Sequence, residues 1–143
     1  MCRLVHFFFP FYLIFINLTS RNIEKAFLQS NAALLASLCP TKGVIQVSLP
    51  EPINFSDILA PGQIKVFFER IFHRYSTFEF FIESPLSISP DNQRWFIRAR
   101  WSFFEKKNLQ QQAFRIYFQV KRETKIKKRG LEWTIIEIRA EKI

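Results

Sequence analysis

Residues 94–104 read RWFIRARWSFF, and large apolar and polar side chains alternate along the whole stretch. One set of alternate positions is mostly apolar, comprising Trp95, Ile97, Ala99, Trp101 and Phe103. The other set is mostly polar, comprising Arg94, Phe96, Arg98, Arg100 and Ser102. Successive side chains of a strand point to opposite faces, so this pattern predicts a long β-strand with one buried and one exposed face.

Two further stretches near the C-terminus show the same alternation. Residues 114–121 place Phe114, Ile116, Phe118 and Val120 opposite Arg115, Tyr117, Gln119 and Lys121. Residues 133–140 place Thr134, Ile136, Ile138 and Ala140 opposite Trp133, Ile135, Glu137 and Arg139. A shorter alternation groups Phe78, Phe80 and Ile82, and the Pro- and Ser-containing segment 84–92 is expected to be a loop that ends that strand. These patterns predict an antiparallel meander.

The residues before this meander favour helices. Residues 21–38 predict two short helices that are separated at Ser30 and Asn31 and end before Pro40. Residues 44–49 predict a half-buried strand, and a short extended segment follows near Phe55. A longer helix starting near Pro61 carries one apolar stripe at helical spacing, formed by Ile64, Phe67, Phe68, Ile71 and Tyr75.

This order of elements resembles the nuclear transport factor 2-like superfamily, a cone-shaped, cystatin-like α+β fold. The segments that carry the resemblance are IEKAFLQSNAALLASLC (23–39), VIQVSLP (44–50) and KVFFERIFHRYSTFEFF (65–81). In pattern they are similar to small secreted bacterial members with no assigned activity. The resemblance covers residues 21–143 and implies N-terminal helices packed on a strongly curved antiparallel sheet. Such a likeness informs on fold rather than function.

The N-terminal segment 1–20 has the layout of a secretory signal peptide. One basic residue, Arg3, precedes an apolar run from Phe7 to Leu18, and small polar residues follow. We therefore expect an exported protein, periplasmic or secreted, with a single domain over residues 21–143. A buried first strand and an uncleaved anchor are the alternatives. Removal of this segment would leave Cys39 without a disulfide partner, so we interpret it as a buried thiol.

Few residues could carry chemistry. In the superfamily's isomerases and dehydratases, an Asp or His base acts at the bottom of the cone, so the resemblance directs attention to Asp57, Asp91 and His73. Asp57 and Asp91 lie in turn-like contexts, and His73 follows the apolar stripe of its helix. No cluster of residues has the spacing of metal ligands. We expect no catalytic residue, cofactor or metal, with a small-ligand carrier or an isomerase- or dehydratase-like enzyme using the cone interior as the alternative.

The exposed face of the predicted sheet combines arginines with aromatic residues, a composition typical of interface cores. The predicted interface comprises Phe96, Arg98, Arg100, Arg115, Tyr117 and Trp133. The chain carries a net charge of +9, and a second basic feature lies in its last predicted hairpin, at Lys125, Lys127, Lys128 and Arg129. We expect a homodimer or an envelope protein partner; a solvated face is the alternative. Anionic lipid headgroups or wall polymers could meet the hairpin, whereas nucleic acid is not expected in an exported protein.

Overall fold

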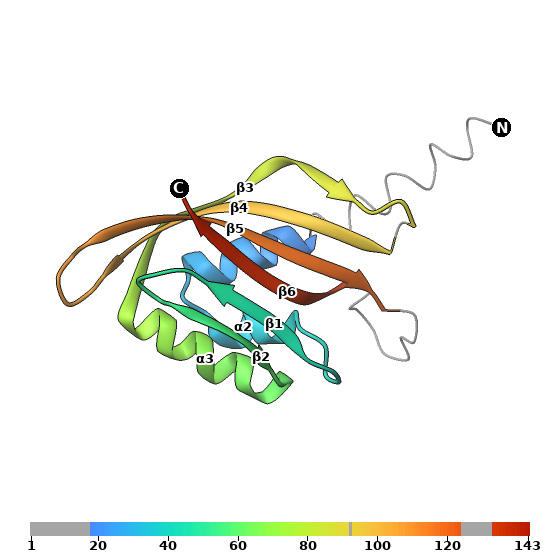
Figure 1. The fold of residues 1–143 in the computed structure, drawn as a ribbon, viewed down its shortest axis with the longest axis horizontal. Helices are drawn as coiled ribbons and strands as arrows, with labels where there is room; N and C mark the ends of the chain where they lie inside the picture. The colour runs from blue at the N-terminus through green and yellow to red at the C-terminus, as the bar shows by residue number, and fades with distance from the viewer. Residues whose placement is uncertain (1–17, 92, 124–132) are drawn as a thin grey trace.

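The computed structural model describes residues 18–91, 93–123 and 133–143 (Figure 1). A helix over residues 18–28 is followed by α2 (Ala32–Ser37), β1 (Ile45–Leu49), β2 (Phe55–Leu59) and α3 (Pro61–Arg74). The remaining strands are β3 (Tyr75–Ile88), β4 (Arg94–Glu105), β5 (Gln111–Arg122) and β6 (Trp133–Lys142). The fold is therefore α+β, as the sequence predicted.

The six strands form one sheet in the order β2-β1-β6-β5-β4-β3. All neighbouring strands are antiparallel except β1 and β6, which run parallel. Strands β3 to β6 arch over the helices, which gather on one side of the sheet (Figure 1). The helices therefore cover only one face of the sheet, and the opposite face is called the outer face below.

Local sequence explains where the helices begin and end. The break between the first two helices falls at Ser30, whose φ is +52°, and at Asn31, whose side-chain oxygen accepts a hydrogen bond from the Leu34 amide at 2.9 Å. Helix α3 begins at Pro61, and the Gln63 side chain accepts a bond from the Ala60 amide at 2.9 Å. Both predicted helical regions are confirmed. No helix within the described residues is long and apolar enough to span a membrane.

Strand β3 is longer and less regular than predicted. It continues to Ile88 through part of the segment that was expected to be a loop, and Ser87 and Ile88 pair with Phe96 and Trp95. Its pairing with β4 shifts register between Thr77 and Glu79 and again between Glu83 and Ser87. The first irregularity leaves Phe78 half exposed, whereas Phe80 is buried. The prediction that Phe78 and Phe80 share a face was therefore wrong.

A second correction concerns Trp133. The sequence placed it on the outer face, but its side chain is only 1% exposed and packs at 86° to Trp95, with ring centroids 6.3 Å apart. The pairing of β5 with β6 shifts register here, because Gln119 pairs with Glu137 while Val120 pairs with Ile135. The extra residue, Ile136, reverses the alternation on its N-terminal side, so Trp133 and Ile135 turn into the core.

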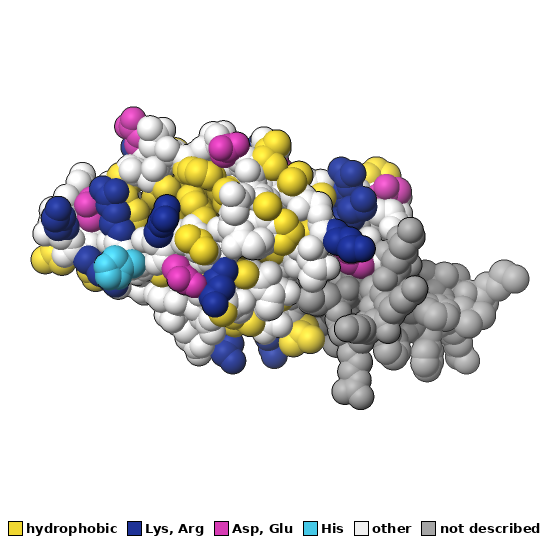
Figure 2. Space-filling view, turned by 90° about the horizontal axis from the view of Figure 1, so that it is seen from below, with side chains coloured by type: hydrophobic (Ala, Val, Ile, Leu, Met, Phe, Trp, Pro, Cys, Tyr) yellow, Lys and Arg dark blue, Asp and Glu magenta, His cyan; other side chains and the backbone are white. Residues whose placement is uncertain are grey.

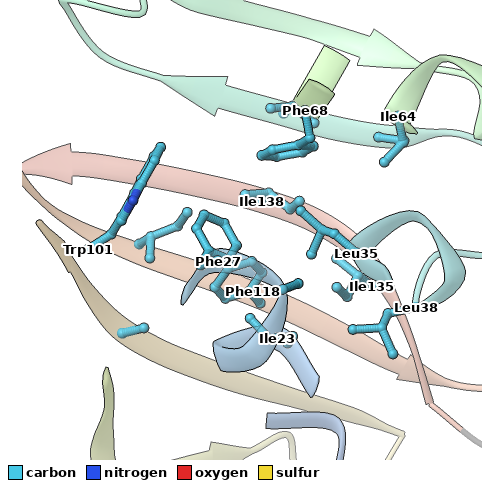
Figure 3. Packing of buried hydrophobic residues seen from close by; sticks show 14 of the residues in the cluster. Ile23, Phe27, Leu35, Leu38, Ile64, Phe68, Trp101, Phe118, Ile135 and Ile138 are labelled. Atoms are coloured by element: carbon cyan, nitrogen blue, oxygen red, sulfur yellow. The ribbon is translucent and has the colours of Figure 1, made fainter. Parts of the chain in front are cut away.

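Aromatic side chains fill the space between the helices and the sheet (Figure 3). Phe27 lies at the centre, reaching from the first helix toward the strands. Its ring centroid is 4.5 to 6.1 Å from those of five other aromatic side chains, namely Phe68, Phe72, Phe80, Trp101 and Phe118. The interior of the cone is thus occupied by the protein's own side chains over the described residues.

Residues 18–20, at the end of the predicted signal peptide, lie in the first helix. Thr19 and Ser20 are buried there, and Leu18 is exposed. A cut after residue 20 would fall inside this helix. The rest of the predicted segment lies outside the described residues.

Candidate functional site

The outer face presents its side chains in rows that cross the strands. One row runs from Glu83 through Arg98 and Tyr117 to Arg139, on β3, β4, β5 and β6 respectively. Directly opposite residues of neighbouring strands have closely spaced side chains, so each row is a line of interacting groups. Five of the six predicted interface residues lie on this face, all except Trp133.

The neighbouring row runs from Phe81 through Arg100 and Arg115 to Glu141. It places two arginines directly opposite each other across β4 and β5. Like charges in this position repel, so the arrangement depends on carboxylates nearby.

Carboxylates from the edge strand β3 pair with these arginines. The Glu83 carboxylate accepts a hydrogen bond from Nε of Arg115 at 3.1 Å and lies 3.9 Å from Nε of Arg98. The hydrogen bond to Glu83 raises the pKa of Arg115. Glu79 is 3.7 Å from Nε of Arg100 and accepts a bond from the Ser102 hydroxyl at 3.2 Å.

Tyr117, in the middle of the face, is held from the β6 side. Its hydroxyl donates a hydrogen bond to Glu141 at 2.9 Å, and the guanidinium carbon of Arg139 lies 5.0 Å from the centroid of its ring. Partial burial is the main cause that raises the pKa of Tyr117, and the hydrogen bond to Glu141 raises it further. The phenol is therefore fixed in place and stays neutral at physiological pH.

The central part of the outer face carries as many acids as bases. Its bases are Arg98, Arg100, Arg115 and Arg139, and its acids are Glu79, Glu83, Glu137 and Glu141. The sequence-based interface named the arginines and none of these acids. Glu79 and Glu83 alternate with Phe80 and Ile82 along β3, so they lie on the outer side of that strand.

Aromatic side chains on the outer face lie mainly on β3 and β4. Phe81 and Phe96 are 42% and 41% exposed, and the exposed Phe78 stacks on Phe104 with ring centroids 6.2 Å apart. Exposed side chains of this size carry a large apolar area. The outer face thus has exposed aromatic side chains along β3 and β4 and paired charges in its centre.

The candidate chemical residues lie outside the cone. Asp57 is exposed on β2, and Asp91 is exposed in a turn where it accepts bonds from Ser89 and the Gln93 amide, which lower its pKa. His73 is exposed on α3 and lines a surface groove of about 470 Å³ with Glu69. Figure 2, viewed from the side of α3, shows the histidine among Lys and Arg side chains.

Two further features bear on possible chemistry. The hydroxyl of Tyr75, at the start of β3, is buried and has no hydrogen-bond partner. Among the described residues, no three His, Cys, Asp or Glu side chains are grouped as metal ligands would be. The basic hairpin residues Lys125, Lys127, Lys128 and Arg129 lie outside the described residues.

No family model and no curated protein matches the sequence. Solved structures do match. A ketosteroid isomerase-like protein from Erwinia carotovora atroseptica is 13% identical, with a TM-score of 0.68, over 92% of this chain and 95% of that one. A DUF4783 family protein from Bacteroides uniformis is 13% identical, with a TM-score of 0.63, over 86% and 95%.

A third match is a dehydratase candidate from the nuclear transport factor 2-like family of Streptomyces avermitilis. It is 12% identical, with a TM-score of 0.62, over 92% of this chain and 96% of that one. At these identities the likeness concerns the fold. The chain has the nuclear transport factor 2-like fold, as its sequence pattern predicted.

Proposed function

We propose that this protein is an exported, non-enzymatic binding module that acts through the outer face of its sheet, and that its partner is a second copy of the chain. The observation that carries the proposal is the outer face itself, where exposed aromatic residues border a charge network with equal numbers of acids and bases. Burial of Phe81 and Phe96 against a partner would supply the apolar contribution to association.

Charge supports a second copy as the partner. Two chains that each carry a formal charge of +9 repel at long range. A contact centred on the part of the face where acids and bases balance adds little repulsion of its own. A polyanion, in contrast, would gain little from arginines that already face carboxylates, as Arg98 and Arg115 do.

The test is sedimentation of the purified protein and two double variants. Phe96→Ser with Arg98→Glu removes one exposed aromatic and reverses one charge on the outer face. Val66→Ser with Arg70→Glu makes the same kinds of change on the exposed side of α3 and is the matched control. The first variant should be monomeric, because it removes one aromatic anchor and reverses one charge, and aromatic or Arg anchors typically contribute about 2 kcal/mol or more each. The control should associate like the unaltered protein.

Salt dependence separates the two kinds of partner. Association of two positively charged copies through a neutral face should strengthen as salt screens their repulsion. Binding of a polyanion should weaken steeply with salt, because counterions are released from it. A protein that stays monomeric at all salt concentrations, or an outer-face variant that still dimerises, would contradict the proposal.

A second candidate function is a small-ligand carrier or an isomerase- or dehydratase-like enzyme that uses the cone interior. The specific observation in its favour is the buried Tyr75 hydroxyl without a partner, since such a group could donate a hydrogen bond to a ligand oxygen. Matched structures carry isomerase and dehydratase names. A ligand in the cone interior must displace aromatic side chains such as Phe27. Titration of the protein and of Tyr75→Phe with a steroid ketone, followed by the NMR shifts of core amides, tests this function.

A further inference from the structure

One end of the outer face contains a half-open groove of about 460 Å³, a volume within the usual range for small-molecule sites. It lies at the first bulge of β3, where β4 and β5 approach the end of β6. We propose that this groove binds a small organic carboxylate with an apolar or aromatic body. The groove is formed by one chain, so the inference goes beyond the proposed self-association and does not depend on it.

The floor of the groove exists because two small residues face each other. Ser102 on β4 pairs with Ala113 on β5, in an outer face whose neighbouring positions carry Arg, Glu and Phe side chains. Short side chains between long ones leave a hollow. The position of the groove therefore follows from the pairing register of β4 and β5.

The bulge of β3 supplies one wall. Because the register shifts between Thr77 and Glu79, both Phe78 and Glu79 are exposed next to the groove. Phe78 is held by its stacking on Phe104, so its ring offers a fixed apolar surface. An aromatic or aliphatic ligand body would pack on this ring.

Arg100 supplies the group that would recognise a carboxylate. Its Nε atom is buried and makes no hydrogen bond, and the nearest carboxylate, Glu79, is at 3.7 Å, beyond hydrogen-bond distance. The opposite arginine, Arg115, is already bonded to Glu83 and also repels Arg100. A ligand carboxylate in the groove would pair with the solvent-exposed part of the Arg100 side chain, which is 42% exposed, and would offset this repulsion.

Two cationic side chains, Arg100 and Lys142, line the groove together with Glu79. Gln111 and Gln112, which also line the groove, can donate hydrogen bonds to ligand oxygens.

The experiment is a backbone-amide NMR titration of the protein with phenylacetate and, separately, with its uncharged analogue phenylacetamide. Phenylacetate should shift the amides of Ser102 and Ala113 saturably, with a dissociation constant of about 1 mM or tighter. Arg100→Gln should weaken binding about tenfold or more, equivalent to about 1.4 kcal/mol. Arg94→Gln, an exposed position on the same strand and face, is the matched control and should bind like the unaltered protein.

A second variant tests the groove rather than its charge. Ala113→Leu keeps every charge and fills the floor, so it should abolish binding while the amide spectrum away from the groove stays unchanged. The proposal is overturned if phenylacetate gives no saturable shift at the groove, if phenylacetamide binds equally well, or if either groove variant binds like the unaltered protein.

Discussion

Replacing Phe27 by alanine would remove the side chain around which the interior of the cone is packed. Phe27 is fully buried, and its ring stacks on Phe80 at 4.5 Å. It also makes edge contacts with rings from α3 and the sheet, the nearest being Trp101 at 5.1 Å and Phe72 at 5.5 Å. The truncated side chain would therefore leave a cavity with walls on both layers of the fold.

We expect Phe27→Ala to lower the free energy of unfolding by about 3 to 5 kcal/mol, the range for a buried phenylalanine. Loss of hydrophobic transfer accounts for about 1.5 to 3 kcal/mol of this. The remainder comes from the cavity and from lost ring pairs, which are worth about 0.5 to 1.5 kcal/mol each and do not add independently. We expect a value in the upper half of the range of about 3 to 5 kcal/mol. The surrounding rings belong to both the helices and the sheet, so they cannot easily move together to close the cavity.

Urea denaturation followed by circular dichroism measures this loss, with an unchanged slope as the sign of an intact fold. Phe78→Ala is the matched control, since it deletes the same atoms from a phenylalanine that is 51% exposed. That control should lose about 1 kcal/mol or less. The argument fails if Phe27→Ala loses under about 1 kcal/mol, or no more than Phe78→Ala.

Three further predictions follow from burial and from the N-terminal pattern. Trp133→Ser should lower the free energy of unfolding, measured in urea, by about 3 to 5 kcal/mol, whereas Phe96→Ser should lower it by about 1 kcal/mol or less. Equal losses would contradict the burial of Trp133. Burial raises the pKa of the Cys39 thiol to about 12, so iodoacetamide at neutral pH should label it over about a hundredfold more slowly in the folded than in the unfolded protein, as measured by mass spectrometry. Residues 1 to about 20 should be missing from the exported native protein, and N-terminal sequencing that finds Met1 on a cytoplasmic protein would contradict this.

Regular periodicity explains which elements the sequence predicted correctly. In β4 every second residue from Trp95 to Phe103 is buried, because an uninterrupted strand carries its alternation from end to end. Strand β5 behaves in the same way from Phe114 to Val120. The apolar stripe of α3 places Ile64, Phe68 and Ile71 in the core.

The outer face was harder to predict because it depends on pairing between strands. Glu83 reaches both Arg98 and Arg115 only through the registers of β3 on β4 and of β4 on β5. Register is set by bulges and turns, and neither leaves a periodic signal in one strand. The sequence therefore indicated an arginine-rich face, and the structure shows which acids the strand pairing brings beside those arginines.

The two sites proposed here depend on the same kind of irregularity. In β3 the shift near Thr77 exposes Phe78 and Glu79 together, which creates a wall of the groove and one acid of the charge network. In β6 the shift at Ile136 turns Trp133, the first residue of the strand, into the core, so this end of the outer face lacks a tryptophan. A regular β6 would place a tryptophan on the outer face, and a regular β3 would lack the exposed pair beside Arg100. The bulges thus determine which residues are available for binding, although the overall fold follows from the regular strands and helices around them.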